Sequence, residues 1–296
     1  MAHASNGQPR QILLALDLST MVVLAYASPH EIVAVDPELS TSGGADTIVD
    51  FDDLLQGKTA FPLTLDGFTR FLDNVEFSAE NIRFYMDVVQ YEEACESGSC
   101  DVVKRLLTGI VEKYIKDDAP EMININGCTR QRILDEFEAY RRVEPSRLQS
   151  AKQETYRMMR HGAFPRWIDR QVTQNLGAKG ICLRRNCFFA SSVVLLTSLS
   201  LMVGLRASIL YRLLLILPCL AVGYCFENWR SKFCIIVARR GETADVDGTI
   251  RPIQDEALKR KAKAYTQEVV RRAFCKSIAL FALIFCIPDA DGRWNV

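Results

Sequence analysis

Apolar positions between residues 61 and 176 recur at helical intervals. One stripe follows the i, i+3, i+4, i+7 spacing of a single buried helical face: Phe68, Phe71, Leu72 and Val75. Another stripe runs from Val103 to Ile115 and stops before Pro120, which cannot continue a helix. Because no alternating strand pattern of useful length interrupts these stripes, the sequence predicts an all-α bundle, which we place at residues 56–177.

Capping residues predict several helix boundaries inside this bundle. Ser78 is the predicted cap of the helix that follows it, with Glu80 in the favourable first turn. Thr129 is the predicted cap of a later, shorter helix. Gly162 is predicted to end the helix that opens near Pro145.

After Asn186 the chain carries apolar runs long enough to cross a bilayer. Residues 187–205 contain no charge over nineteen positions, which at the helical rise corresponds to about 28 Å. A second run, 207–226, is long enough only if Arg212 reaches back to the membrane surface. A third run, 273–288, is shorter and also fits a core helix of a soluble protein. The sequence therefore predicts about three transmembrane helices after the bundle.

The charge distribution predicts how these runs are oriented. Basic residues precede the first run and crowd the segment 227–272, whereas few fall on the opposite side. Cationic flanks stay in the cytosol, so the bundle and this basic segment are expected there, and the tail Asp289–Val296 outside. The stretch Lys259–Arg272 fits either contact with anionic lipid or an ordinary solvated helix. Whether the lipid bilayer is the plasma membrane or an endomembrane stays open, as does oligomerisation through the spans.

The first 55 residues fit more than one interpretation. Ile12 to Ala27 is apolar, follows Arg10, and has the outline of a secretory signal. Asp17 interrupts that apolar stretch, and a signal would send the following domain out of the cytosol. The alternative is an N-terminal arm at residues 1–55, either packed on the domain or poorly ordered.

Composition argues against several functional classes. The 36 basic residues balance 36 acidic ones, which argues against a generic nucleic-acid binder. The ten cysteines include no C-x-x-C pair and the chain has three histidines, so neither a metal site nor a cofactor is expected. Neither a phosphate-binding G-x-x-x-x-G-K-[ST] loop nor a G-x-S-x-G elbow occurs, and His161 is the one histidine of the bundle. The chain is therefore not expected to be an enzyme.

Cysteines near the predicted membrane borders are candidates for acylation: Cys182, Cys187 and Cys275.

Several sequence blocks follow one another at a characteristic spacing. They are Phe68–Leu72, Glu76–Tyr85, Ile123–Arg130, Ala151–Met159 and Phe164–Ile168. Together they resemble the regulator of G-protein signalling (RGS) domain, and the resemblance covers residues 61–176. Such a domain followed by about three spans is similar in layout to fungal membrane-anchored RGS proteins.

The resemblance implies a function without a catalytic centre in this chain. Domains of this kind bind the switch regions of a GTP-bound G-protein α subunit (Gα) and speed its GTP hydrolysis. Gα supplies its own arginine and its own water-positioning glutamine, so the partner only has to hold mobile switches in the transition-state geometry. The implied function is a membrane-tethered GTPase-activating protein that attenuates signalling.

By position, the resemblance implies a Gα-binding surface in three parts. The loop and helix start that meet the switches are Glu76, Phe77, Ser78, Glu80 and Asn81. Asn124 matches an asparagine that lies near the catalytic glutamine of Gα, where its amide can both donate and accept. The last contact region matches Met158, Met159 and Arg166.

The chain also departs from the family pattern. Gly162 stands where an acidic residue commonly grips the first switch, and Ala163 replaces the polar residue that often follows. Losing one buried charged hydrogen bond costs about 2–3 kcal/mol, which weakens binding by roughly a hundredfold. These departures favour a second hypothesis, an RGS-like scaffold or cell-polarity landmark protein without GTPase-activating activity. The retained Glu80, Asn81 and Asn124 favour the activator.

Overall fold

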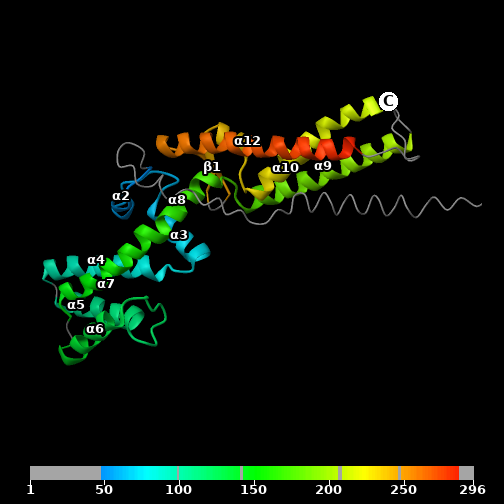
Figure 1. The fold of residues 1–296 in the computed structure, drawn as a ribbon. Coiled ribbons are helices and arrows are strands. Elements are labelled where there is room, and N and C mark those ends of the chain that lie inside the picture. The colour runs from blue at the N-terminus through cyan, green and yellow to red at the C-terminus, as the bar shows by residue number, and fades with distance from the viewer. Residues whose placement is uncertain (1–47, 99, 141–142, 206–208, 246–247, 287–296) are drawn as a thin grey trace, which may run out of the picture. The chain divides into compact units, whose positions relative to one another are not determined.

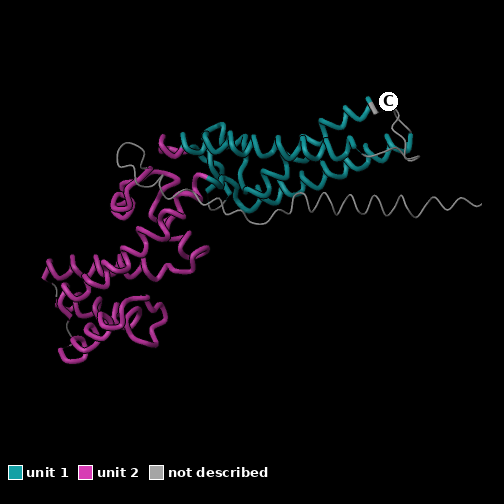
Figure 2. The backbone as a smooth tube through the Cα atoms, in the orientation of Figure 1, with its two compact units in different colours: residues 1–47, 173–252, 259–296 teal, residues 48–172, 253–258 magenta. Residues whose placement is uncertain are grey.

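The chain forms two compact units, which Figure 2 colours separately. This computed structural model describes residues 48–98, 100–140, 143–205, 209–245 and 248–286. We call residues 48–172 with 253–258 the helical domain, and residues 173–252 and 259–286 the C-terminal unit. The predicted signal segment Ile12–Ala27, almost all of the arm 1–55 and the tail Asp289–Val296 lie outside the described residues.

The helical domain is built from α-helices (Figure 1). Several of these helices continue directly into π-helical turns. The α-helices are α2 Phe51–Leu55, α3 Leu65–Phe71, α4 Glu80–Ser97, α5 Cys100–Ile110, α6 Gly127–Tyr140, α7 Pro145–Met158 and α8 Phe164–Thr173. The π-helical turns are η2 Leu72–Glu76, η3 Val111–Ile115 and η4 Met159–Ala163. Among the described residues of this domain there is no strand, so the all-α prediction is confirmed.

One hydrophobic cluster joins α4, α5, α6 and α7. Phe84 and Tyr114 are fully buried and meet edge to face, with ring centroids 5.5 Å apart. The Tyr91 hydroxyl donates to the Val143 carbonyl at 2.7 Å, which satisfies the polar end of another buried ring. Burial of these large side chains drives the packing that the helical stripes in the sequence predict.

A second cluster takes in residues that lie before the predicted start of the domain. The ring of Phe51 in α2 lies 5.9 Å from that of Phe68, whose ring lies 5.3 Å from that of Trp167. Leu54 is fully buried in the same cluster. The domain therefore begins before residue 56, because α2 supplies part of its core.

A segment from much later in the chain completes this second cluster. Ile253 is 5% exposed and Leu258 fully buried among its members. The Gln254 N–H donates to the Phe61 carbonyl at 3.1 Å, which fixes the segment to the loop before α3. A fragment that ends near residue 177 would therefore lack two core side chains.

The expected helix end at Gly162 does not occur. The chain passes from α7 through η4 into α8 without leaving a helical path. Pro165, in the first turn of α8, has no N–H to donate to the preceding turn, so the local hydrogen-bond register widens to the π type instead of stopping.

The C-terminal unit contains long helices and one small hairpin. Its elements are α9 Ala178–Gly204, η5 Ile209–Leu215, α10 Ile216–Arg230, α11 Ile235–Arg239, β1 Glu242–Ala244, β2 Ile250–Pro252 and α12 Glu256–Phe285, whose first turn belongs to the helical domain. The antiparallel strands pair Thr243 with Arg251. This hairpin and α11 lie in the first part of the basic segment 227–272, and α12 contains the stretch Lys259–Arg272.

Two stretches of the described chain are long and apolar enough to cross a membrane. They are residues 178–204 and 210–230. The third expected span, 273–288, is not among them, because α12 brings Arg271, Arg272 and Lys276 close to its apolar end. A count of about three spans is therefore not confirmed.

The outer surface of α9 and α10 is apolar, while a carboxylate is buried inside the unit. Leu201 and Leu217 are 62% and 69% exposed. Glu227 of α10 is 2% exposed, and its carboxylate lies 2.6 Å from the Lys276 ammonium and 3.4 Å from the Arg272 guanidinium, both on α12. Exposed apolar surface of this extent is unfavourable in water.

We predict that Leu258→Ala destabilises the helical domain by about 2–5 kcal/mol, because it removes a fully buried side chain from the second cluster. The effect is measured by heating the purified full chain and detecting the unfolding of the helical domain from its cleavage by a protease. Gln254→Ala is the matched control, since it alters an exposed side chain and leaves its backbone hydrogen bond in place. Equal unfolding temperatures for the two variants would contradict this packing.

Candidate functional site

A left-handed turn between η2 and α4 presents an exposed aromatic side chain. Phe77 has φ 52° and ψ 41°, a conformation that is uncommon for a bulky residue. Its side chain is 81% exposed, so burial does not explain the conformation. The Ser78 N–H donates to the Leu72 carbonyl at 3.0 Å, which closes the turn across η2. Backbone strain held in this way is typical of functional loops.

The asparagine that follows this turn is fastened to it. The Asn81 side-chain amide donates to the Ser78 carbonyl at 3.2 Å and to the Glu80 carboxylate at 3.0 Å. Its own carbonyl oxygen is buried and has no hydrogen-bond partner among the described residues. The expected side-chain cap at Ser78 is not formed, because Ala79 is the N-cap and the Ser78 backbone carbonyl is used instead. Burial raises the pKa of Glu80, and the nearby Glu121 carboxylate adds to that shift.

Asn124 lies in an extended segment that alternates buried and exposed side chains. Ile123 and Ile125 are buried, so the Asn124 side chain between them is exposed. The Ile123 N–H donates to the Tyr114 carbonyl at 3.1 Å. The Arg130 guanidinium donates to the Ile115 and Ile123 carbonyls at 2.7 Å each, which ties the segment to η3. The carboxamide of Asn124 is thus held outward by a rigid backbone.

The helix after Asn124 is capped by a residue that the sequence interpretation missed. The Asn126 side-chain oxygen accepts from the Cys128 N–H at 2.8 Å, and α6 begins at Gly127. The Asn126 N–H in turn donates to the Glu154 carboxylate at 3.0 Å. Thr129, the predicted cap, lies inside the helix.

A surface hollow of about 480 Å³ joins the turn to the loop that leads to Asn124. Its lining comes from both sides: Asp73, Phe77, Ala79, Glu80, Arg83, Pro120, Glu121 and Met122. Arg83 crosses the base of the hollow, where its guanidinium pairs with Asp73 and lies 3.4 Å from the Glu121 carboxylate. The structure therefore brings two predicted site residues, Phe77 and Glu80, to the same hollow as the 120–122 loop. Arg83 and Glu121, which hold that arrangement, were not predicted.

A bidentate ion pair connects the turn to α8. The Arg166 guanidinium donates to both Glu76 oxygens, at 2.9 and 2.7 Å. Hydrogen bonding to Arg166 lowers the pKa of the Glu76 carboxyl below its usual 4.5, and the same contact raises the pKa of Arg166. Gly162 lies next to this pair, since a Cβ built on it would be 3.9 Å from an Arg166 nitrogen. That distance is ordinary van der Waals contact, so a side chain fits at this position.

The two predicted methionines occupy different environments. Met158 is half-buried at the end of α7. Met159 is 2% exposed and packs in the second cluster. Of this pair, only Met158 has surface available for a partner without a rearrangement of the core.

Comparison with known proteins relates the helical domain to a family. Residues 50–176 match the family model described as "Regulator of G protein signaling domain". This part of the chain is therefore an RGS domain.

The relatives found belong to the same class. Over 152 residues the chain is 27% identical to mouse Regulator of G-protein signaling 18. The aligned region makes up 51% of this chain and 59% of the mouse protein. The rat protein of that name is 25% identical over 153 residues, with shares of 51% and 60%. The chain thus spans less than two thirds of the length of these relatives.

We predict that Arg166→Gln raises the pKa of Glu76 toward 4.5, measured by ¹³C NMR of the labelled side-chain carboxyl. Because the folded-state pKa is depressed, the ion pair contributes stability above the unfolded pKa and loses it as the pH falls through the folded pKa. Arg157→Gln, which alters an exposed arginine at the C-terminal end of α7, is the control and should leave the Glu76 pKa unchanged. An unaltered Glu76 titration in Arg166→Gln would show that the pair is not formed in solution.

Proposed function

We propose that this chain is a membrane-tethered RGS-type GTPase-activating protein that binds the switch regions of a Gα subunit and attenuates its signalling. The observation that carries the proposal is the RGS domain at residues 50–176. Within it, the exposed Asn124 follows the loop that lines a hollow with Phe77 and Glu80. These groups make a preformed polar surface of the kind that can hold a mobile partner loop.

The chemistry required of such a surface is positioning. A Gα subunit carries its own arginine and glutamine for GTP hydrolysis, so the activator needs no nucleophile, base or metal. A rigid surface that fixes the switches beforehand lowers the entropic and reorganisation part of the barrier. The ties from Arg130 to Ile115 and Ile123 supply that rigidity on one side of the hollow. The Arg83 contacts with Asp73 and Glu121 supply it at the base.

The predicted contact residues take different parts in this proposal. Those with an exposed or partly exposed side chain are assigned to direct contact: Phe77, Ser78, Glu80, Asn81, Asn124 and Met158. Glu76 and Arg166 form an ion pair that holds the turn against α8, so their effect on binding is partly indirect. Met159, in the core, supports the backbone beneath Met158.

The membrane tether is part of the proposal. The apolar surface of α9 and α10 supports insertion, and the basic flanks favour a cytosolic RGS domain. The layout resembles fungal membrane-anchored RGS proteins. Because Gα subunits are lipidated and lie on the same leaflet, tethering would raise the effective concentration of the two partners.

One observation favours a scaffold without GTPase-activating activity. Gly162 provides no side chain beside the Glu76–Arg166 pair, and Ala163 is 6% exposed, so neither offers a polar contact. Because a side chain fits at position 162, this alternative can be tested by introducing an acidic residue there.

We predict that Asn124→Ala slows the GTP hydrolysis that the full chain stimulates by about tenfold, because the variant loses a carboxamide at the switch contact. The measurement is single-turnover hydrolysis by a lipidated Gα of the source organism, with both proteins in the same vesicles. Gln153→Ala, an exposed amide on α7, is the control and should match the wild type. If the wild-type chain does not stimulate GTP hydrolysis, the activator proposal is wrong and the scaffold hypothesis remains.

We predict that Gly162→Asp strengthens binding to Gα by roughly tenfold or more, because the added carboxylate restores a charged hydrogen bond to the first switch. Gly162→Ala fills the same space without charge and should bind as the wild type does. Binding is measured by titrating the full chain against Gα in its GDP–aluminium fluoride state. Equal affinities for the two variants would mean that position 162 does not face the switch.

A further inference from the structure

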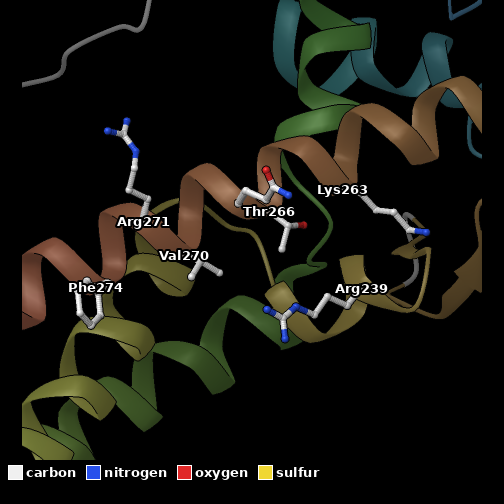
Figure 3. A pocket seen from close by; sticks show the side chains of 7 residues that line it. Arg239, Lys263, Thr266, Val270, Arg271 and Phe274 are labelled. Carbon is white, nitrogen blue, oxygen red and sulfur yellow. The ribbon is translucent and has the colours of Figure 1, made fainter.

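A cationic hollow lies in the C-terminal unit between α11 and α12, far along the sequence from the RGS domain (Figure 3). Its volume is about 470 Å³. In Figure 3, the Arg239 side chain runs from α11 along α12, and its guanidinium lies below the turn that carries Thr266, whereas the Lys263 side chain points in the opposite direction. Lys263 lies one turn before Thr266, and Val270 lies one turn after it.

Two of the cationic side chains that line this hollow, Arg239 and Lys263, have no acidic partner among the described residues. Arg271, at the rim, is instead held by Glu268, with a nitrogen–oxygen distance of 2.8 Å. The Thr266 hydroxyl donates to the Ala262 carbonyl at 2.9 Å. The charge left uncompensated at one end of the hollow is therefore positive and suits an anionic ligand.

An apolar row leads away from this cationic end. Val270, Phe274 and Ile278 are 37%, 56% and 38% exposed. Their spacing of four residues places them on one face of α12, over a length of about 12 Å. A ligand that matches both parts carries a negative head and a long apolar chain. Free phosphate would use only the first part.

We propose that this hollow binds an anionic phospholipid, with the lipid phosphate at Arg239, the charge of Lys263 at the rim of the hollow, and an acyl chain along Val270, Phe274 and Ile278. The proposal rests on the proposed membrane tether, because the row must face the bilayer. In the orientation favoured by the basic flanks, the cations meet the cytosolic leaflet, which is the anionic one. The bound lipid would fix the depth and rotation of α12.

The test uses the full chain in detergent, titrated with dioctanoyl phosphatidic acid and followed by native mass spectrometry. Arg239→Gln with Lys263→Gln is expected to weaken lipid binding by about tenfold or more. The matched control is Arg240→Gln with Arg260→Gln, which removes the same charge from neighbouring exposed positions, the C-cap of α11 and the second turn of α12, and should cost less than about threefold. Dioctanoyl phosphatidylcholine and inorganic phosphate are the comparison ligands, and both are expected to bind at least about tenfold more weakly than phosphatidic acid.

Three outcomes would overturn the proposal. Equal losses in the two double variants would mean diffuse surface charge, and inorganic phosphate binding as tightly as the lipid would mean a simple anion site. Phosphatidylcholine binding as tightly would mean apolar contact alone. Alkaline extraction of membranes tests the tether independently of lipid binding, because a chain that spans the membrane stays in the pellet. A chain that stays in the pellet yet shows no preference for the anionic lipid refutes the site alone, whereas a chain that is released refutes both proposals.

Discussion

The apolar outer surface of α9 and α10 is the constraint on which the rest of this account depends. Leu201 and Leu217 point outward, while the charged Glu227 is buried against Lys276 and Arg272. A water-soluble unit has the opposite arrangement, with charges outside and leucines inside. Close packing at Gly223, where an added Cβ would lie 2.0 Å from the Ser277 hydroxyl, is also typical of helices that associate in lipid. The proposed tether follows from this inversion.

The proposed tether can offset binding free energy that the unusual RGS surface lacks. In the proposed complex, the charged hydrogen bond that Gly162 cannot make would weaken the contact with Gα, and confinement to one leaflet would offset that loss through a high local concentration of the partner. A soluble RGS domain with the same surface would have no such compensation. The rigid ties around Asn124 act in the same direction, since a preformed surface loses less entropy on binding.

Sequence periodicity predicted what depends on local spacing. The stripes through Phe68 and Val103–Ile115 predicted α3 and α5 because one face of each helix is buried. Long-range partners carry no such signal. Leu258 enters the RGS core from far along the chain, and its burial cannot be read from the residues around it.

The site shows the same division between local and distant contacts. Asn124 and the turn at Phe77 were predicted from family-like blocks, whereas Arg83 and Arg130 were not, because their roles depend on carbonyls and carboxylates of other elements. The π-helical passage at Gly162 was missed because the effect of Pro165 on the preceding turn outweighs the tendency of glycine to end a helix.

Protease protection would show on which side of the membrane the RGS domain lies and whether α9 crosses it. Sealed membrane vesicles with the cytosolic face outward are treated with trypsin, and fragments are identified with antibodies to residues 50–176 and to α9. We expect the RGS domain to be digested while a fragment spanning residues 187–226, with Arg206 and Arg212 uncut, survives until detergent is added. Survival of the RGS domain in intact vesicles, or cleavage at Arg206 without detergent, would contradict this topology.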